Sequence, residues 1–435
     1  MGIHGEYRLV VIVSAPRAGA LLAEHTGRSK SVAIVGAGPA GLFAAEHLAG
    51  LGHTVAVYER MPSPARKFLM AGRGGLNLTH SESLKTFLTR YHDPEGVIGR
   101  VVRAFPPSAL IAWANGLGAE TFVGSSGRVF PKAMKASPLL RAWLRRLDGL
   151  GVILKTGWTW HGFGKCPTHL LFDTPQGTQT VTADAVLLAL GGASWPRLGS
   201  DGAWVAILKQ AEVGIAPLSP SNCGISVPWS PHMAKRAGSP LKRIAVTCGQ
   251  HTQKGEAVIT RSGLEGGAIY ALSHAVRVAL EGGPALIHLD LRPDLSLEDL
   301  ARRIEAAPAK STWSNLLRKA GGLSSGAAAI VREAGAIPRA ASELAARIKN
   351  VPVRVSGLSG LERAISTAGG IKAESVDDHM MLKMLPGVFV AGEMLEFDAP
   401  TGGYLLQAAF ASGRLAAEGI AIRLQVSKTA PGQPG

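Results

Sequence analysis

A glycine-rich turn between residues 36 and 41 restricts the possible folds more than any other feature of the sequence. The apolar run Ser31-Val-Ala-Ile-Val predicts a short buried strand, and it leads directly into Gly36-Ala-Gly38-Pro-Ala-Gly41. Small residues over 42–51 predict a helix, and residues 54–58 predict a second strand that ends at Glu59. This order predicts a βαβ unit whose turn binds the pyrophosphate of a dinucleotide.

The three glycines have separate roles in this motif. Gly36 permits the tight turn, Gly38 lets the backbone approach the pyrophosphate, and Gly41 lets the helix pack against the sheet. Free N–H groups and the helix dipole favour negative charge at the helix N-terminus. Glu59 is placed to accept hydrogen bonds from an adenosine ribose, and an acid there disfavours the 2′-phosphate of NADP.

The 435 residues are too many for one compact core, so two or three domains are expected. Further buried strands are predicted over 183–190 and 387–391, and a last helix over 404–422. Prolines, short polar–apolar alternations and helical stretches near 297–306 and 340–349 predict an inserted domain with a sheet and a helical part. The predicted boundaries are an N-terminal extension over 1–30, a nucleotide-binding domain in two parts over 31–192 and 366–425, the insert over 193–365, and a flexible tail over 426–435.

FAD is the dinucleotide that the rest of the chain favours. A second glycine-rich stretch, 321–326, has the wrong spacing for another dinucleotide turn, and no strand precedes it. The strand over 387–391 runs into Gly392 and Glu393, and a glycine-opened helix follows, which suits a cofactor that spans the sheet. Glu393 could hold a ribityl hydroxyl, and the helix N-terminus could stabilise anionic reduced flavin. The sequence therefore predicts FAD, bound without a covalent link.

Further motifs occur in a fixed order over residues 66–67, 71–79, 128–131, 191–202, 366–370, 391–394 and 401–407. Together with the turn they resemble the BaiN-like (aminoacetone-oxidase-like) NAD(P)/FAD-dependent oxidoreductases, from about residue 31 to residue 422. The resemblance implies an α/β fold, namely a discontinuous, Rossmann-like FAD-binding domain of glutathione-reductase type with an inserted sheet-plus-helix domain. It also implies NAD(P)H as a transient donor.

Two departures from this family's pattern indicate a side branch with a different substrate. Leu76 stands where the family has a cysteine beside the flavin, so chemistry that needs a thiol there is not expected. Residues 260–267 also differ from the family's sequence in that stretch.

The predicted cofactor-binding residues come from the turn and, by the resemblance, from the other motifs. They are Gly36, Gly38, Pro39, Ala40, Gly41, Glu59, Arg66, Lys67, Gly72, Arg73, Gly74, Asn77, Thr79, Gly191, Gly192, Gly370, Gly392, Glu393, Thr401, Gly402, Gly403 and Tyr404. His80, Asp398 and Tyr404 are candidates for moving a proton near the flavin. His80 could equally be an ordinary loop histidine, and Asp398 a turn former. Motifs for a serine nucleophile or a metal centre are absent, so no metal is predicted.

The chain is basic, with 46 Lys and Arg against 31 Asp and Glu, a formal net charge of +15. Eight basic residues against one acid form a basic stripe: Arg128, Lys132, Lys135, Arg141, Arg145, Arg146, Lys155 and Lys165. The stripe could attract RNA, or it could be a solvated helix face. Trp158 and Trp160 lie within it, and they could stack on bases or face a core.

Three functions from different classes follow from these observations. The first is an FAD-dependent oxidoreductase that acts on a small molecule. The second is an RNA-modifying flavoenzyme that reduces a base, as a dihydrouridine synthase does. The third is a non-catalytic scaffold that holds FAD. Three cysteines without a CxxC pair exclude a disulfide framework, and no apolar run approaches the roughly 18 residues of a membrane span. A cytoplasmic protein without a membrane span is expected.

Overall fold

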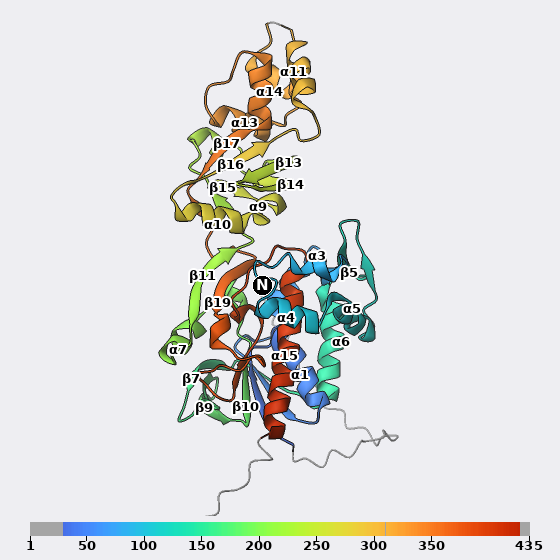
Figure 1. Ribbon diagram of the computed structural model, residues 1–435, viewed down its shortest axis with the longest axis vertical. Helices are drawn as coiled ribbons and strands as arrows, with labels where there is room; N and C mark the ends of the chain where they lie inside the picture. Colours follow the sequence, from blue (N-terminus) through green and yellow to red (C-terminus); the bar gives the residue numbers. More distant parts are fainter. Residues whose placement is uncertain (1–28, 309, 427–435) are drawn as a thin grey trace, which may run out of the picture.

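The structure is a computed structural model that describes residues 29–308 and 310–426. Most of the predicted extension over 1–30 and of the predicted tail over 426–435 lies outside the described residues. The chain forms two bodies along one long axis, joined by a narrow waist (Figure 1). The lower body contains both ends of the described chain, and the upper body contains its middle.

A five-stranded parallel sheet forms the centre of the lower body. Its order is β20 (Val388–Val390), β10 (Ala185–Leu188), β1 (Ser31–Val35), β2 (Thr54–Glu59) and β6 (Ile153–Thr156). β1 reads as a continuous apolar run because both faces of a central parallel strand are covered, and residues 32–35 are almost fully buried. The predicted α/β class and the predicted βαβ unit are confirmed.

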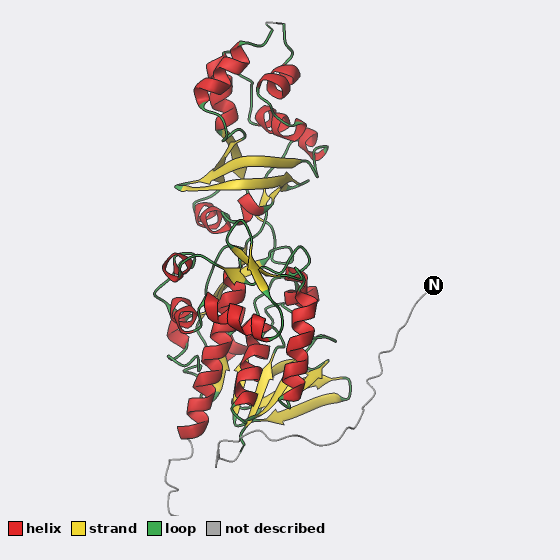
Figure 2. Cartoon of the chain, turned by 90° about the vertical axis from the view of Figure 1, so that its right-hand side faces the viewer, coloured by secondary structure: helices red, strands yellow, loops and turns green. Residues whose placement is uncertain are grey.

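Helices cover one face of this sheet, and a three-stranded meander covers the other (Figures 1 and 2). The helices of the lower body are α1 (Pro39–Gly50), α2 (Arg66–Ala71), α3 (Leu84–Leu88), α4 (Val97–Ala104), α5 (Pro107–Gly116), α6 (Ala136–Gly149), α7 (Trp204–Gln210) and α15 (Tyr404–Val426). The ring of Phe43 on α1 lies 5.2 Å from that of Phe410 on α15, and Trp143 on α6 lies 5.4 Å from Phe410. The meander packs through Phe172, whose ring stacks 4.7 Å from Tyr58.

Three smaller sheets surround this centre. The meander is β7 (Thr159–Phe163), β8 (His169–Thr174) and β9 (Gly177–Thr182), and β3 (Thr79–His80), β5 (Arg128–Pro131) and β4 (Thr121–Val123) form another sheet. The waist contains the antiparallel pair β11 (Ile215–Ser221) and β19 (Ser366–Ile371). The chain therefore leaves the lower body and returns to it through two adjacent strands.

The upper body is an antiparallel sheet with α9 (Gly267–Tyr270) and α10 (Ser273–Glu281) on the side of the waist and the other helices mainly beyond it (Figures 1 and 2). The sheet order is β17 (Val351–Val355), β16 (Ala285–Asp290), β13 (Pro240–Cys248), β14 (His251–Ile259), β15 (Gly263–Glu265), β12 (Ile225–Ser226) and β18 (Gly357–Leu358). The other helices are α8 (Pro231–Ala234), α11 (Leu297–Glu305), α12 (Trp313–Asn315), α13 (Ser325–Glu333) and α14 (Ala341–Lys349). α11 and α14 match the two predicted helical stretches.

The two separate hydrophobic cores indicate an insert that starts later than the predicted residue 193. Trp204, Leu208 and Val213 belong to the core of the lower body, whereas the second core runs from Ile225 to Val355. α7 carries two of these residues into the lower core, so an insert that starts near residue 222 agrees better with the packing than one that starts at 193. Within the two described ranges, no helix has both the length and the apolar character that a bilayer crossing requires.

Candidate functional site

A cavity of about 570 Å³ lies at the carboxyl ends of β1, β2 and β10, where ligands of open α/β sheets bind. We call it the cofactor pocket. Fourteen of the predicted cofactor residues line it: Gly36, Gly38, Pro39, Ala40, Glu59, Arg66, Lys67, Asn77, Gly191, Gly392, Glu393, Thr401, Gly402 and Gly403. They come from both ends of the lower-body sequence, so the fold assembles this pocket only after the chain returns from the insert.

The geometry of the turn matches the role of each glycine. Gly36 has a φ of +106°, and a Cβ there would lie 2.3 Å from the carbonyl oxygen of Ala189. A Cβ at Gly41 would lie 2.0 Å from the carbonyl oxygen of Gly36. At Gly38, by contrast, no atom lies within 4 Å of where a Cβ would be. Two of the glycines therefore serve packing, and Gly38 leaves open space in the pocket wall.

The N-terminus of α1 has features that favour binding of an anion. Gly38 precedes the helix, no side chain caps it, and its first turn carries no acidic residue. The first N–H groups of a helix lack helical partners, and the helix dipole adds positive potential there. The open space at Gly38 and these unpaired donors fit a pyrophosphate.

Glu59 lies in the pocket, and its carboxylate has protein partners. Oε2 accepts a hydrogen bond from the Ala37 N–H at 2.9 Å, and Oε1 accepts one from the Met61 N–H at 2.8 Å. These bonds fix the carboxylate at the end of β2, and each oxygen keeps a second lone pair. The predicted bond from Glu59 to a ribose stays a prediction.

Lys67 places a positive charge inside the pocket. Its Nζ donates to Glu393 Oε2 at 2.6 Å and to Ser194 Oγ at 2.5 Å. Glu393 also accepts hydrogen bonds from the N–H groups of Thr367, at 3.0 Å, and Gly192, at 3.3 Å. Glu393 therefore holds Lys67 and two backbone segments together, in addition to any contact with a ligand.

Eight predicted cofactor residues lie outside the lining of this cavity. They are Gly41, Gly72, Arg73, Gly74, Thr79, Gly192, Gly370 and Tyr404. Thr79 is fully buried and donates to Gln407 Oε1 at 2.9 Å, and a Cβ at Gly370 would lie 2.5 Å from the carbonyl oxygen of Met394. Arg73 and Gly74, by contrast, are exposed. Direct contact of these eight residues with a cofactor stays a prediction.

The cavity has further lining residues that the sequence analysis did not assign to the cofactor. Trp158, Trp160, Trp195, Ser200 and Phe397 are among them. Trp195 and Ser200 lie inside the motif at 191–202, so that motif could have identified them as pocket residues from the sequence. The two meander tryptophans gave no such signal, because their approach to the end of β2 depends on how the meander folds over the sheet.

Buried polar atoms around the cavity also fit a bound cofactor. Arg66 Nε, Asn77 Oδ1, Trp160 Nε1 and Ser200 Oγ are buried without a hydrogen-bond partner, and all four side chains line the cavity. Native proteins rarely leave such atoms unpaired, so a ligand with several polar groups is expected here. Leu76 is fully buried and lies outside the lining, which explains why an apolar residue suits that position.

His80 and Tyr404 lie outside the cofactor pocket and contact each other. Their rings stack 5.8 Å apart, and the Tyr404 hydroxyl donates to Glu82 Oε1 at 2.7 Å. Burial and this bond to a carboxylate raise the pKa of Tyr404 well above its usual value. His80 Nδ1 accepts a hydrogen bond from the Glu82 N–H at 3.2 Å. These contacts favour a structural role, and catalysis by either residue stays a prediction.

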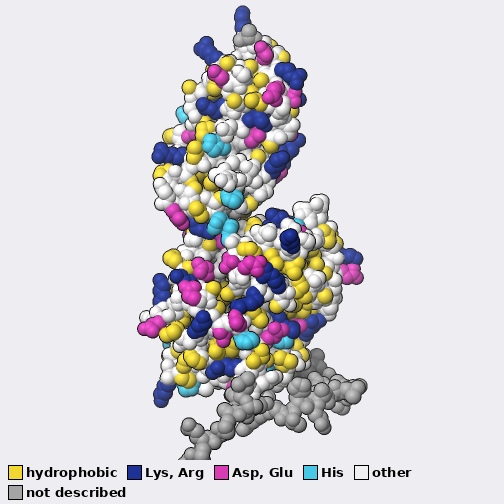
Figure 3. Space-filling model, in the orientation of Figure 1, with side chains coloured by type: hydrophobic (Ala, Val, Ile, Leu, Met, Phe, Trp, Pro, Cys, Tyr) yellow, Lys and Arg dark blue, Asp and Glu magenta, His cyan; other side chains and the backbone are white. Residues whose placement is uncertain are grey.

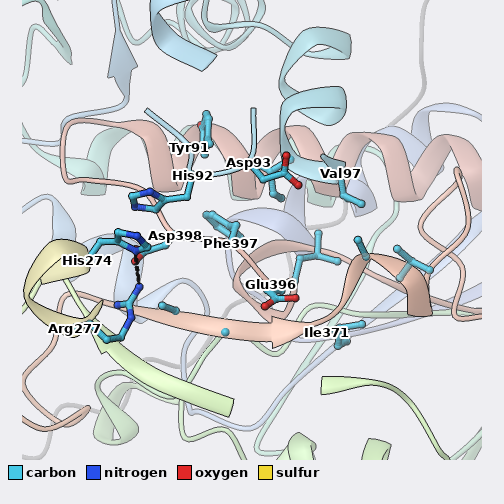
Figure 4. A pocket seen from close by; sticks show the side chains of 16 residues that line it. Tyr91, His92, Asp93, Val97, His274, Arg277, Ile371, Glu396, Phe397 and Asp398 are labelled. Atoms are coloured by element: carbon cyan, nitrogen blue, oxygen red, sulfur yellow. Dashed lines mark hydrogen bonds and ion pairs between the residues drawn. The ribbon is translucent and has the colours of Figure 1, made fainter. Parts of the chain in front are cut away.

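Asp398 lines a second cavity of about 410 Å³ at the waist, which we call the junction pocket (Figure 4). Its carboxylate is 8% exposed, and it accepts hydrogen bonds from Ser221 Oγ and Arg277 Nη2, both at 2.5 Å. Burial alone would raise the pKa of Asp398, but the bonds from His274, Arg277 and Ser221 outweigh burial and hold it at about 2. Asp398 is therefore ionised at neutral pH, and its predicted part in moving a proton stays a prediction.

Three potential metal ligands meet beside this pocket. Ligand atoms of His92, His274 and Asp398 lie within 4.8 Å of one another, and the two imidazole rings stack 3.5 Å apart. Arg277 Nη2 lies 2.9 Å from His274 Nδ1 and also donates a hydrogen bond to Asp398. The guanidinium of Arg277 therefore already contacts the atoms of His274 and Asp398 that would bind a metal ion. Parallel rings also cannot both aim a nitrogen lone pair at one ion. The cluster is better described as an ion pair that joins the two bodies.

The basic stripe does not form one continuous free surface. Arg146 pairs with Glu46 at 2.9 Å, Lys132 pairs with Glu120, and the Lys155 ammonium lies 4.5 Å from the ring centre of Trp158. Figure 3 shows Lys and Arg side chains spread over both bodies on this face. On this face, positive charge is therefore spread over both bodies.

Comparisons with known proteins agree with this geometry. Residues 30–419 match the family model of the HI0933-like protein Rossmann domain. A 3-dehydro-bile acid delta(4,6)-reductase of Clostridium scindens is 25% identical over 419 residues, covering 90% of this chain and 99% of that protein. A ribosomal RNA dihydrouridine synthase of Escherichia coli is 22% identical over 405 residues, covering 89% of this chain and 97% of that protein.

A solved structure shares the fold. A flavocytochrome c3 fumarate reductase in its open conformation aligns with a TM-score of 0.51 and 15% identity, covering 91% of this chain and 78% of that one. This likeness shows that the architecture is one that known flavoproteins use.

Proposed function

The chain belongs to the family of the HI0933-like protein Rossmann domain, whose members are FAD-dependent oxidoreductases, and from this premise we propose that it reduces a small organic molecule with electrons from NAD(P)H. The observation that supports a dinucleotide in this proposal is the uncapped N-terminus of α1 beside the open space at Gly38. A relative that is named a reductase, and that matches almost end to end, supports the direction of the reaction.

When bound, FAD would supply the hydride chemistry, and the chain would bind and orient it. The N–H groups at the start of α1 would hold the pyrophosphate. Lys67 contributes a positive charge within the pocket, and its bond to Glu393 fixes the position of that charge. Gly402 and Gly403 line the pocket directly before α15, so the positive end of that helix dipole would face a cofactor bound there.

An anaerobic spectrum tests the cofactor and the donor in one experiment. We expect the protein to purify with oxidised flavin bands that disappear when NADPH or NADH is added, because hydride passes to the flavin. Reduction with dithionite serves as the control. A flavin that dithionite reduces but neither nucleotide reduces would overturn the NAD(P)H donor and leave a substrate-driven enzyme or a redox-silent scaffold. A colourless protein that FAD does not reconstitute would overturn the cofactor.

RNA modification is a second candidate, favoured by the relative that acts on ribosomal RNA and by the net charge of +15. Lys and Arg contacts to phosphates release counterions, so RNA binding of this type weakens steeply as salt rises. Arg141 and Arg145 lie one turn apart on the exposed face of α6, and no ion pair to either is among those of the described residues.

A double variant, Arg141→Ser with Arg145→Ser, tests this second candidate. If RNA crosses α6, we expect the slope of log affinity against log salt to fall by about 2, because each lost phosphate contact removes about 1. Filter binding of ribosomal RNA fragments at several salt concentrations measures it. Wild-type protein that binds no RNA at low salt would remove the candidate.

The cytoplasmic location is also a proposal. All three cysteines, Cys166, Cys223 and Cys248, are free thiols, which agrees with a reducing compartment.

A further inference from the structure

Three consecutive residues at the waist, Ser221, Asn222 and Cys223, are buried where the chain leaves the lower body. They are 2%, 2% and 1% exposed. Ser221 is the last residue of β11, and the second core begins at Ile225. Polar residues that are buried this deeply are expected to be fully hydrogen-bonded, so their partners show what the segment holds.

Asn222 holds the backbone of the segment that precedes α15. Its Nδ2 donates to the carbonyl oxygen of Ala399 at 2.8 Å and to Ser366 Oγ at 2.8 Å. Its Oδ1 accepts from the Thr401 N–H at 2.9 Å. Both amide protons and the carbonyl oxygen are therefore used. The residue has a φ of +49°, a conformation that asparagine tolerates better than most side chains do.

The two neighbours of Asn222 bind different bodies. Ser221 Oγ donates to Asp398 Oδ1 at 2.5 Å in the lower body. The Cys223 N–H donates to Ser273 Oγ at 3.0 Å, at the first residue of α10 in the insert. One buried tripeptide thus connects the insert to residues 398–401.

The segment that Asn222 holds forms a wall of the cofactor pocket. Phe397, Thr401, Gly402 and Gly403 all line that pocket. Gly402 and Gly403 have φ values of +139° and +98°, and glycine backbone has more conformations to lose than any other. The amide of Asn222 fixes Ala399 and Thr401, directly before these two glycines, and so restricts the conformations of this wall.

We propose that Asn222 is a positioning residue for the flavin site, which sets the shape of residues 399–403 and thereby the affinity and reduction potential of the bound FAD. Asn222 acts through the backbone of Thr401 and Ala399 and does not line the cofactor pocket itself. The inference rests on the proposed function only in requiring FAD in the cofactor pocket, and it needs neither NAD(P)H nor a substrate.

Asn222→Gly is the variant that isolates the side chain. Glycine adopts a φ of +49° without strain, so this change removes the three hydrogen bonds and leaves the backbone conformation allowed. We expect FAD to bind at least tenfold more weakly. We also expect the absorption bands and the midpoint potential of the remaining flavin to differ from those of the wild type, which a loss of stability alone would not produce.

Glu212→Gly is the matched control, because Glu212 also has a left-handed φ, +58°, but is exposed at the end of α7. It should match the wild type in both readouts. Asn222→Asp has nearly the same size and keeps the acceptor for the Thr401 N–H, but it loses the two donors and places a buried carboxylate oxygen against the Ala399 carbonyl oxygen, so its FAD affinity should fall at least as far as that of Asn222→Gly. This second variant keeps the test decisive if Asn222→Gly does not fold.

Titration of the apo-protein with FAD and reductive titration with dithionite and a reference dye give both readouts. Wild-type affinity and potential in folded Asn222→Gly or Asn222→Asp protein would overturn the positioning role. Wild-type protein that binds no FAD would instead overturn the proposed cofactor, so the two failures are distinguishable.

Discussion

A Gly38→Val variant is expected to fold as the wild type does and to bind FAD about 100-fold more weakly, which is about 2.8 kcal/mol at 1.4 kcal/mol per tenfold change. No protein atom lies within 4 Å of the added Cβ, and the φ of −83° suits any residue, so the folded chain accepts the side chain. The new methyl groups would fill the space beside the uncapped start of α1, where the pyrophosphate needs close backbone approach. The measurements are the flavin-to-protein ratio, an FAD titration and the melting temperature of the apo-protein.

Two further variants distinguish the effect of filling the open space at the turn from the effect of disturbing its packing. Gly50→Val is the matched control, since Gly50 lies at the other end of α1 and also has no neighbour within 4 Å of a Cβ. It should retain FAD. Gly41→Ala should instead lower stability, because its Cβ would meet the Gly36 carbonyl oxygen at 2.0 Å. Stoichiometric flavin in Gly38→Val would show that the phosphates do not lie at this turn.

The sequence alone predicted those parts of the site whose elements follow one another closely along the chain. Strand, turn, helix and strand follow one another within about thirty residues, so their periodicity and glycine spacing predicted β1, α1 and β2 to within a few residues. Glu59 could be assigned to the pocket because it ends β2, and Lys67 could be assigned because it lies in a motif of the family resemblance. Prolines, short polar–apolar alternations and helical stretches predicted the insert. Its starting point is difficult to predict, because α7 and β11 resemble insert sequence although they pack in the lower core.

The junction pocket was beyond the reach of sequence reasoning. His92, His274 and Asp398 come from three segments more than a hundred residues apart, and only the docking of α10 on the lower body brings them together. Asp398 was predicted as a candidate for moving a proton, but the sequence does not reveal that Arg277 and Ser221 bind its carboxylate. Contacts across a waist depend on the relative position of two bodies, and no local pattern encodes that position.

Arg277→Met should be the most destabilising of the side-chain changes considered, by about 3–5 kcal/mol, because it leaves the Asp398 carboxylate buried without its cationic partner. Arg302→Met is the matched control. Arg302 is exposed and pairs with Asp299 on the surface of α11, so its loss should cost about 1 kcal/mol or less. Urea denaturation at pH 7 compares the two variants. Equal losses in both would show that the ion pair at the waist does not anchor the insert.

The pH dependence of stability gives an independent check on this ion pair. The pKa of Asp398 is about 2 in the folded protein, and an unfolded aspartate titrates near about 3.9. The carboxylate therefore contributes stability that is full above about pH 4 and is lost as the pH falls toward 2. Without Arg277, only His274 and Ser221 oppose the effect of burial, so the pKa of Asp398 rises from its wild-type value and protonation relieves the buried charge at a higher pH. The stability difference between wild type and Arg277→Met should accordingly shrink between pH 5 and pH 3, and a difference that stays constant would contradict an ionised Asp398 as its cause.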